Sequence, residues 1–105
     1  MNKQEYIQAN RDWLKAKAQE DGVKALPHGI YYKVISEGRN DGVHPSLRSV
    51  VTAHYNGWTI DGKVFDSSRE RGYPEAFRLG DLILGWQIAL TQMHVGDHWI
   101  VYIPY

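Results

Sequence analysis

Gly22 separates two parts of the chain whose hydrophobic residues follow different periods. Residues 4–19 contain neither glycine nor proline. Their large apolar residues recur seven positions apart, as in an amphipathic helix: Tyr6 with Trp13, and Ile7 with Leu14. Asn2 and Glu5 have the spacing of a capping box, and Gly22 stands where a glycine often follows a helix. The sequence predicts a helix over residues 2–20, which must dock its apolar stripe on its own domain or on a second copy.

Beyond Gly22, turn residues divide the chain into short segments rich in β-branched and aromatic residues. Such segments predict strands, here over residues 30–36, 50–59, 63–66, 77–79 and 98–103. Asp61-Gly62 between the second and third of them predicts a two-residue hairpin turn. Residues 39–49 and 67–74 are rich in glycine, proline and short polar residues and predict loops.

One more helix is expected over residues 82–93. Its apolar residues repeat at helical spacing, and they are Trp86, Ala89, Leu90 and Met93. A helix this short and apolar must pack against a sheet. The sequence therefore predicts an α+β fold, an antiparallel β-sheet wrapped around one short α-helix and preceded by an N-terminal helix.

Composition excludes several classes of protein. Twelve Lys and Arg balance twelve Asp and Glu, which argues against a dedicated binder of nucleic acid or of membrane surfaces. Cysteine is absent, so disulfides, cysteine nucleophiles and cysteine-based zinc sites are excluded. His94 and His98 are four apart, but Gly96 interrupts the helix that would place them together, so no metal site is expected.

The first residues of the chain contain no apolar segment of the kind that secretory signals carry. Together with the absence of cysteine, this favours a cytoplasmic protein. The alternative is a periplasmic protein whose signal is not part of this sequence.

Residues 51–104 carry short motifs in a fixed order. They are His54-Tyr55-x-Gly57, Asp61-Gly62-x-x-Phe65-Asp66-Ser67-Ser68, Arg71-Gly72-x-Pro74, Phe77-x-Leu79-Gly80, Ile83-x-Gly85-Trp86, Ala89-Leu90-x-x-Met93-x-x-Gly96 and Ile103-Pro104. No single motif is specific, but their order and spacing resemble the FKBP-type peptidyl-prolyl cis/trans isomerases. The N-terminal helix and residues 29–35 further resemble the bacterial branch related to macrophage infectivity potentiator. This resemblance implies a helical extension over residues 1–22 and an isomerase domain over residues 23–105.

The resemblance also implies a binding site for the proline of a polypeptide substrate. Trp86 would form the floor of an aromatic pocket, whose walls would be Tyr55, Phe65, Phe77 and Leu82. Taken alone, each of these is more simply interpreted as a core or strand residue. Such a site acts without cofactor or metal, and macrolide inhibitors and a homodimer through the N-terminal helix are further implied partners.

The resemblance further implies that Asp66, Tyr55 and Ile83 act on the twisting peptide bond and that Arg71 belongs to the substrate-binding residues. The resemblance places Asp66 beside the amide, oriented by Tyr55 and paired with Arg71, while the backbone N–H of Ile83 would hold a substrate carbonyl. Without the motif, Asp66 would be interpreted as a turn cap and Arg71 as a surface charge. The leading hypothesis is an isomerase that assists protein folding. The alternative is a non-catalytic chaperone or interaction module that binds proline-containing segments.

The chain departs from the family pattern at two places. Glu75 stands where some family members have an aromatic wall residue, which is expected to weaken the binding of macrolides. The sequence also stops directly after Ile103-Pro104, where family members continue with a tyrosine-bearing loop and a last strand. We therefore expect the isomerase domain to be C-terminally incomplete, as part of a longer chain or with the missing strand supplied by another copy.

Overall fold

A computed structural model describes residues 2–39 and 41–104 of the chain. Met1, Asn40 of the predicted loop 39–49, and Tyr105 at the end of the predicted domain lie outside the described residues. Among the described residues, no helix is long and apolar enough to cross a membrane.

Helix α1 (Lys3–Ala18) begins at the predicted capping box. Asn2 Oδ1 accepts the Glu5 backbone N–H at 2.8 Å, and Asn2 Nδ2 donates to Glu5 Oε1 at 2.8 Å, so that prediction is confirmed. The prediction that Gly22 directly follows the end of the helix is wrong. The helix ends earlier, and Gly22 (φ +81°) lies in the turn before the first strand, where Val23 N–H donates to the Glu20 carbonyl.

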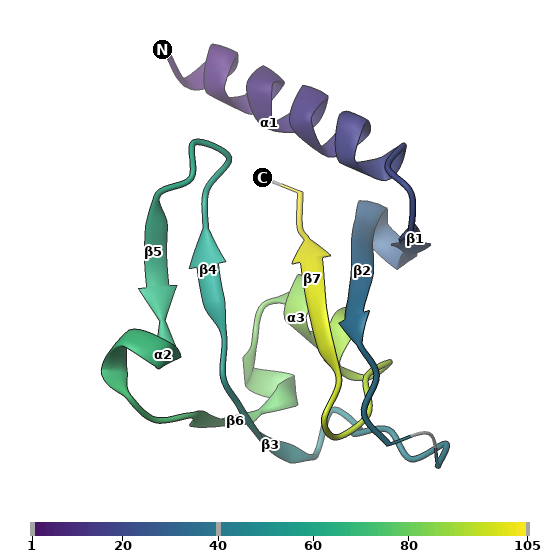
Figure 1. The fold of residues 1–105 in the computed structure, drawn as a ribbon. Helices are drawn as coiled ribbons and strands as arrows, with labels where there is room; N and C mark the ends of the chain where they lie inside the picture. Colours follow the sequence, from purple (N-terminus) through teal and green to yellow (C-terminus); the bar gives the residue numbers. More distant parts are fainter. Residues whose placement is uncertain (1, 40, 105) are drawn as a thin grey trace.

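Helix α1 docks on its own domain, one of the two alternatives for its apolar stripe. It lies across one end of the strands (Figure 1), and the Trp13 ring meets the Tyr102 ring edge-on at a centroid distance of 5.6 Å. Tyr102 is only 8% exposed beneath this contact. Burying two large rings against each other fixes the helix to the sheet below it.

The largest sheet has the strand order β1-β2-β7, with both pairings antiparallel. Its strands are β1 (Val23–Leu26), β2 (Ile30–Ser36) and β7 (His98–Tyr102), and a short 3₁₀ turn, Pro27–Gly29, joins the first two. β2 has the predicted bounds, and β7 ends one residue before its prediction. β1 was not predicted from the sequence, because Val-Lys-Ala-Leu is too short to display a period of its own.

Two further strand pairs stand apart from this sheet. β3 (Val50–Ala53) pairs with β6 (Glu75–Arg78), and β4 (Asn56–Trp58) pairs with β5 (Val64–Ser67), both antiparallel. The predicted strand 50–59 is thus wrong as a single element, since its two halves have different partners. The antiparallel α+β class is confirmed, but the strands of the described part form three separate sheets rather than one.

The β4–β5 hairpin has a longer turn than the sequence predicted. Thr59 N–H donates to the Lys63 carbonyl at 3.0 Å, which leaves three residues in the loop. Gly62 adopts φ +82°, as expected of the glycine that ends a three-residue loop with a bulge. The prediction of a two-residue turn is therefore wrong by one residue.

Helices replace part of what was expected around β6. The predicted loop 67–74 contains helix α2 (Ser68–Arg71), which Ser67 caps by accepting the Glu70 N–H at 3.2 Å. The predicted strand 77–79 begins earlier, at the start of β6, and its last residue opens the 3₁₀ turn Leu79–Asp81. Helix α3 (Leu84–Leu90) is shorter at both ends than its prediction.

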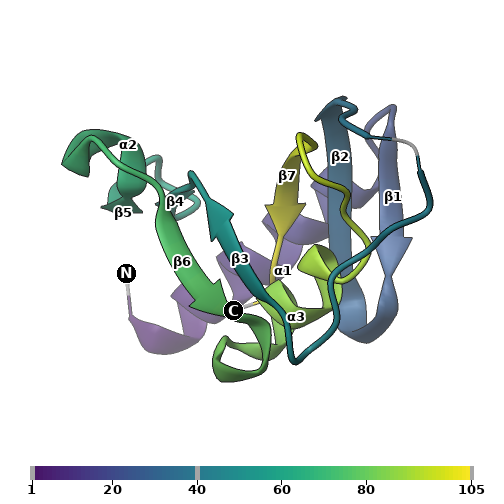
Figure 2. The ribbon, with the colours of Figure 1, turned by 90° about the horizontal axis from the view of Figure 1, so that it is seen from below.

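Helix α3 lies against the β1-β2-β7 sheet in both views (Figures 1 and 2). A Cβ atom on Gly85 would stand 2.9 Å from the side chain of Ile103, so a larger residue here would force that side chain to move. Fully or nearly buried apolar residues of the described part are few: Ile30, Leu79, Ala89 and Tyr102. Each of them therefore supports a large share of the core.

A substitution of Leu79 tests how much this small core depends on one residue. It is 0% exposed, and Leu79→Ala should lower the free energy of unfolding by about 2–5 kcal/mol, because the cavity it leaves cannot fully close. Leu47→Ala is the matched control, since Leu47 is 50% exposed and should lose less than about 1 kcal/mol. Urea denaturation of both variants measures the difference, and equal losses would contradict this account of the core.

Candidate active site

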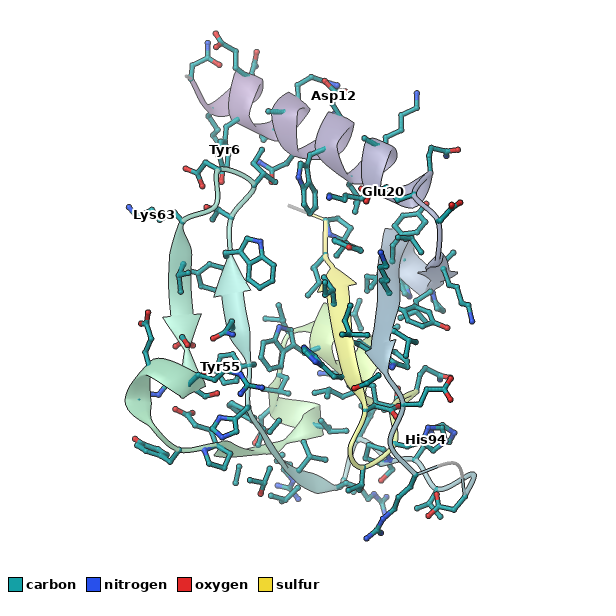
Figure 3. The ribbon with its side chains drawn as sticks, in the orientation of Figure 1. Tyr6, Asp12, Glu20, Tyr55, Lys63 and His94 are labelled. Carbon is teal, nitrogen blue, oxygen red and sulfur yellow. The ribbon has the colours of Figure 1, made fainter. Side chains whose placement is uncertain are left out.

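Tyr55, Asp66 and Arg71 form one hydrogen-bonded group. The Tyr55 hydroxyl donates to Asp66 Oδ2 at 2.7 Å, and Arg71 donates to Asp66 Oδ1 at 2.6 Å and to the Tyr55 hydroxyl at 2.8 Å. The three side chains come from the β3–β4 connection, from β5 and from the last turn of α2. The structure thus brings the Asp66 carboxylate together with the two residues expected to orient it and pair with it; Figure 3 labels Tyr55 beside α2.

Ser68 positions Tyr55, and sequence reasoning gave it no role. Its side chain is 0% exposed, and its hydroxyl accepts the Tyr55 backbone N–H at 2.7 Å. Ser68 N–H in turn donates to the Tyr55 carbonyl at 3.0 Å. His54 Nδ1 lies 3.0 Å from the same hydroxyl. These bonds end β3 at this point and direct Tyr55 toward Asp66, and the only signal in the sequence was the position of Ser68 within a motif.

Three rings pack around this group. Tyr55 meets Trp86 edge-on at a centroid distance of 5.0 Å, and Phe77 lies 5.7 Å from Tyr55 and 5.9 Å from Trp86. The rings come from the β3–β4 connection, from β6 and from α3. We call these three residues the aromatic cluster. Through Tyr55 it directly contacts a charged carboxylate.

The remaining predicted residues lie at the margin of the aromatic cluster. Phe65 is 70% exposed, and within the described part of the chain no ring contact joins it to the cluster. Its ring instead covers Gly57, where a Cβ would stand 2.6 Å from it. Leu82 is half-buried just before α3. Phe65 therefore does not stand as a wall against the other rings in this structure.

Ile83 presents its backbone at the start of α3. Its carbonyl accepts the Trp86 and Gln87 N–H groups at 3.1 Å each, and its side chain is 63% exposed. Among the described residues, no acceptor takes a hydrogen bond from the Ile83 N–H. This donor is therefore available to a bound molecule three positions before Trp86.

The charges of the group hold Asp66 in its ionised form. The hydrogen bond from Arg71, followed by that from Tyr55, lowers the pKa of Asp66 below its usual range. The hydrogen bond to Asp66 raises the pKa of Arg71. The hydrogen bond that the Tyr55 hydroxyl donates to Asp66 likewise raises the pKa of Tyr55. Near neutral pH the group therefore contains a carboxylate, a guanidinium and a neutral phenol.

Other parts of the molecule offer less chemistry. Cavities of about 250 and 330 Å³ lie along α1, lined by residues such as Ile7 and Arg11, away from the aromatic cluster. In the part of the chain that the structure describes, no group of three or more His, Asp or Glu is arranged to hold a metal ion. The hydrogen-bonded group and the aromatic cluster together are the site with the most organised chemistry.

Known proteins resemble this chain in sequence and in fold. A family model described as FKBP-type peptidyl-prolyl cis-trans isomerase matches residues 42–105. A peptidyl-prolyl cis-trans isomerase Mip of Coxiella burnetii is 45% identical over 95 residues, which are 90% of this chain and 40% of that protein. A macrophage infectivity potentiator of Trypanosoma cruzi is 46% identical over 88 residues, 84% of this chain and 44% of that protein. The chain thus spans less than half the length of these relatives.

A solved structure agrees over a larger share. The crystal structure of a peptidyl-prolyl cis-trans isomerase from Pseudomonas syringae pv. tomato superposes with a TM-score of 0.85 and 32% sequence identity. The match covers 96% of this chain and 72% of that one. The α+β arrangement described above is therefore that of a known fold.

The lowered pKa of Asp66 predicts how the stability of the protein depends on pH. An unfolded Asp has a pKa of about 4, and the folded value is lower, so folding favours the ionised form. The resulting stabilisation is complete above about pH 4–5 and is lost as the pH falls through the folded value. We expect Asp66→Asn to be less stable than the parent at pH 7 and to lose less stability between pH 7 and pH 3.

Urea midpoints across this range measure the effect, with Asp21→Asn, an exposed carboxyl in the turn after α1, as the control. If Asp21→Asn and Asp66→Asn have the same acid profile, the hydrogen-bonded group contributes nothing to the pH dependence.

Proposed function

The chain belongs to the FKBP-type peptidyl-prolyl cis-trans isomerases, and we propose on this basis that it accelerates rotation about X–Pro bonds in polypeptides. The observation that carries the proposal is the contact between an ionised, hydrogen-bonded carboxylate and three clustered rings, made through Tyr55. Members of this family act on proline-containing substrates. The physical task is therefore to lower the barrier to one rotation.

That barrier has an electronic origin. Resonance gives the C–N bond partial double-bond character and a rotational barrier of roughly 18–20 kcal/mol. The planar amide is more dipolar than the twisted one, so an apolar environment raises its free energy relative to the transition state. Each ~1.4 kcal/mol removed from the barrier increases the rate about tenfold. No covalent intermediate and no proton transfer is needed.

We assign the proline ring to the aromatic cluster, against the indole of Trp86. Stacking a saturated ring on aromatic faces removes it and the adjoining amide from water. The available N–H of Ile83 would donate a hydrogen bond to the carbonyl oxygen of a neighbouring peptide unit of the substrate. Leu82 and Phe65 would contact the substrate at the margin of the cluster, where the Phe65 ring, packed over Gly57, is 70% exposed.

We assign Asp66 to the twisting amide itself. During rotation the amide nitrogen loses its resonance, and the carbonyl carbon retains a partial positive charge. A fixed carboxylate near that carbon stabilises the twisted state electrostatically. The hydrogen bonds from Tyr55 and Arg71 support this assignment, because they fix the position of the carboxylate before substrate arrives.

A binding module without catalysis is the second candidate. It is favoured by the exposure of apolar side chains next to the site, Phe65 at 70%, Ile83 at 63% and Leu84 at 54%. A surface of this kind holds unfolded or proline-containing segments by burial alone. The two candidates differ in whether Asp66 matters.

Removing the Asp66 carboxylate distinguishes the two candidates. In a prolyl isomerisation assay on a short peptide, we expect Asp66→Ala to keep the fold and to lose about tenfold or more in kcat/KM. Trp86→Ala should weaken peptide binding and also destabilise the protein through a cavity. Asp21→Ala is the control for the loss of one carboxyl group. An Asp66→Ala variant as active as the parent would remove Asp66 from the mechanism.

The isomerisation assay on the parent protein tests whether the activity exists at all. If the parent accelerates isomerisation in this assay, the isomerase assignment stands. If it does not, yet prevents the aggregation of an unfolded protein, the site is a binding surface and the assignment should be dropped.

We further propose that macrolide inhibitors bind this site weakly, because Glu75 places a carboxylate beside Arg71 where an aromatic wall would be more favourable.

We also propose that α1 mediates homodimerisation. Trp13 packs on Tyr102 within the domain, whereas Ile7 and Leu14 of the same apolar stripe line a cavity of about 250 Å³ together with Pro104. A second copy of the same stripe would fill it with apolar side chains. Ile7→Glu should then convert dimers to monomers in sedimentation experiments, whereas Gln8→Glu should not. A parent that is monomeric at every concentration would overturn the proposal.

A further inference from the structure

Arg71 holds a second carboxylate besides Asp66. Its Nη2 atom lies 2.5 Å from Glu75 Oε1, while Nη1 donates to Asp66 at 2.6 Å. One guanidinium thus stands between two carboxylates, and the three side chains together carry one excess negative charge. We call these three residues the acidic bridge.

Glu75 faces the same way as the aromatic cluster. It is the first residue of β6, two positions before Phe77, and side chains two apart on a strand share a face. Both residues are half-buried, whereas Ala76 and Arg78 are exposed on the other face. The carboxylate therefore lies at the edge of the aromatic cluster rather than on the outer surface of the sheet.

We propose that Glu75 makes the site select substrates by charge, favouring a cationic residue before the proline and disfavouring an acidic one. The proposal rests on the isomerase function proposed above. Asp66 is assigned to the amide that joins this residue to the proline, and Arg71 links Asp66 to Glu75 directly. The side chain before the proline therefore enters the field of the acidic bridge.

Solvent exposure and salt screening set how strongly the acidic bridge acts on the residue before the proline. The side chains of Asp66, Arg71 and Glu75 are 40%, 33% and 31% exposed, so water weakens their field. The screening length in physiological salt is about 8 Å, so the field acts only on substrate groups close to the acidic bridge. Other nearby charges on α2 are Arg69 and Glu70, which cancel in sum. Arg71 neutralises one of its two carboxylates, so the charge of Glu75 remains in excess.

The experiment compares peptides that differ only in the residue before proline, Lys, Glu or Ala. For the parent protein, kcat/KM is measured for each peptide, and the Lys-to-Glu ratio is the readout. We expect Glu75→Gln to lower this ratio by about two- to five-fold, because it removes one charge and keeps the size of the side chain. Glu75→Asp keeps the charge and should retain most of the ratio.

Two controls separate a charge effect from a structural one. Glu37→Gln removes an equal charge at an exposed position beyond the end of β2 and should leave the ratio unchanged. Raising the salt concentration should lower the ratio in the parent but barely change it in Glu75→Gln.

The outcomes are distinguishable. If the parent accelerates none of the peptides, the isomerase function fails and the selectivity fails with it. If the parent is active but Glu75→Gln has the same Lys-to-Glu ratio and the same salt dependence, the isomerase function stands and the role of Glu75 is overturned. A ratio lost in Glu75→Gln and kept in Glu75→Asp supports selection by charge.

Discussion

The site depends on one buried hydroxyl group, that of Ser68. It accepts the Tyr55 N–H at 2.7 Å and lies within 3.2 Å of the Tyr55 carbonyl, so both backbone groups of Tyr55 are bonded to one residue of α2. The chain therefore leaves β3 here and resumes as β4 with a different partner strand. That break directs the Tyr55 ring toward Trp86 and its hydroxyl toward Asp66. A continuous strand would have placed Tyr55 in a ladder, without access to Asp66 and Arg71 together.

Local signals in the sequence predicted the bounds of helices and strands better than they predicted which strands pair. The capping box of α1 and the bounds of β2 depend on neighbouring residues alone, and both were correct. The residues 50–59 have the composition of one strand, and nothing local reveals the break, because its cause is Ser68, thirteen positions beyond Tyr55. The turn after Thr59 differs from its prediction for a similar reason. Its length is set by the pairing of Thr59 with Lys63, not by Asp61-Gly62 alone.

The motifs anticipated several side chains that meet here, but neither the part played by Ser68 nor the geometry. Tyr55, Asp66 and Arg71 do meet, and Tyr55, Phe77 and Trp86 do cluster, as the resemblance implied. Phe65 stands away from the rings, because it lies over Gly57, whose lack of a side chain leaves room for it. The partner of Glu75 was also out of reach of the sequence. A glutamate four residues after an arginine is usually a solvated charge, and only the turn at Gly72 brings the two side chains together.

Stability alone does not account for the order around Arg71. Its interactions with Asp66 and Glu75 are about a third exposed, and such pairs contribute roughly 0–1 kcal/mol each. Holding a long arginine side chain in one rotamer costs up to about 2 kcal/mol of entropy, which offsets much of that gain. Yet the guanidinium is held by acceptors from three different elements, Tyr55, Asp66 and Glu75. What this arrangement does provide is a carboxylate fixed beside an aromatic cluster, and a reaction that consists of one rotation depends on such fixed charges rather than on reactive groups.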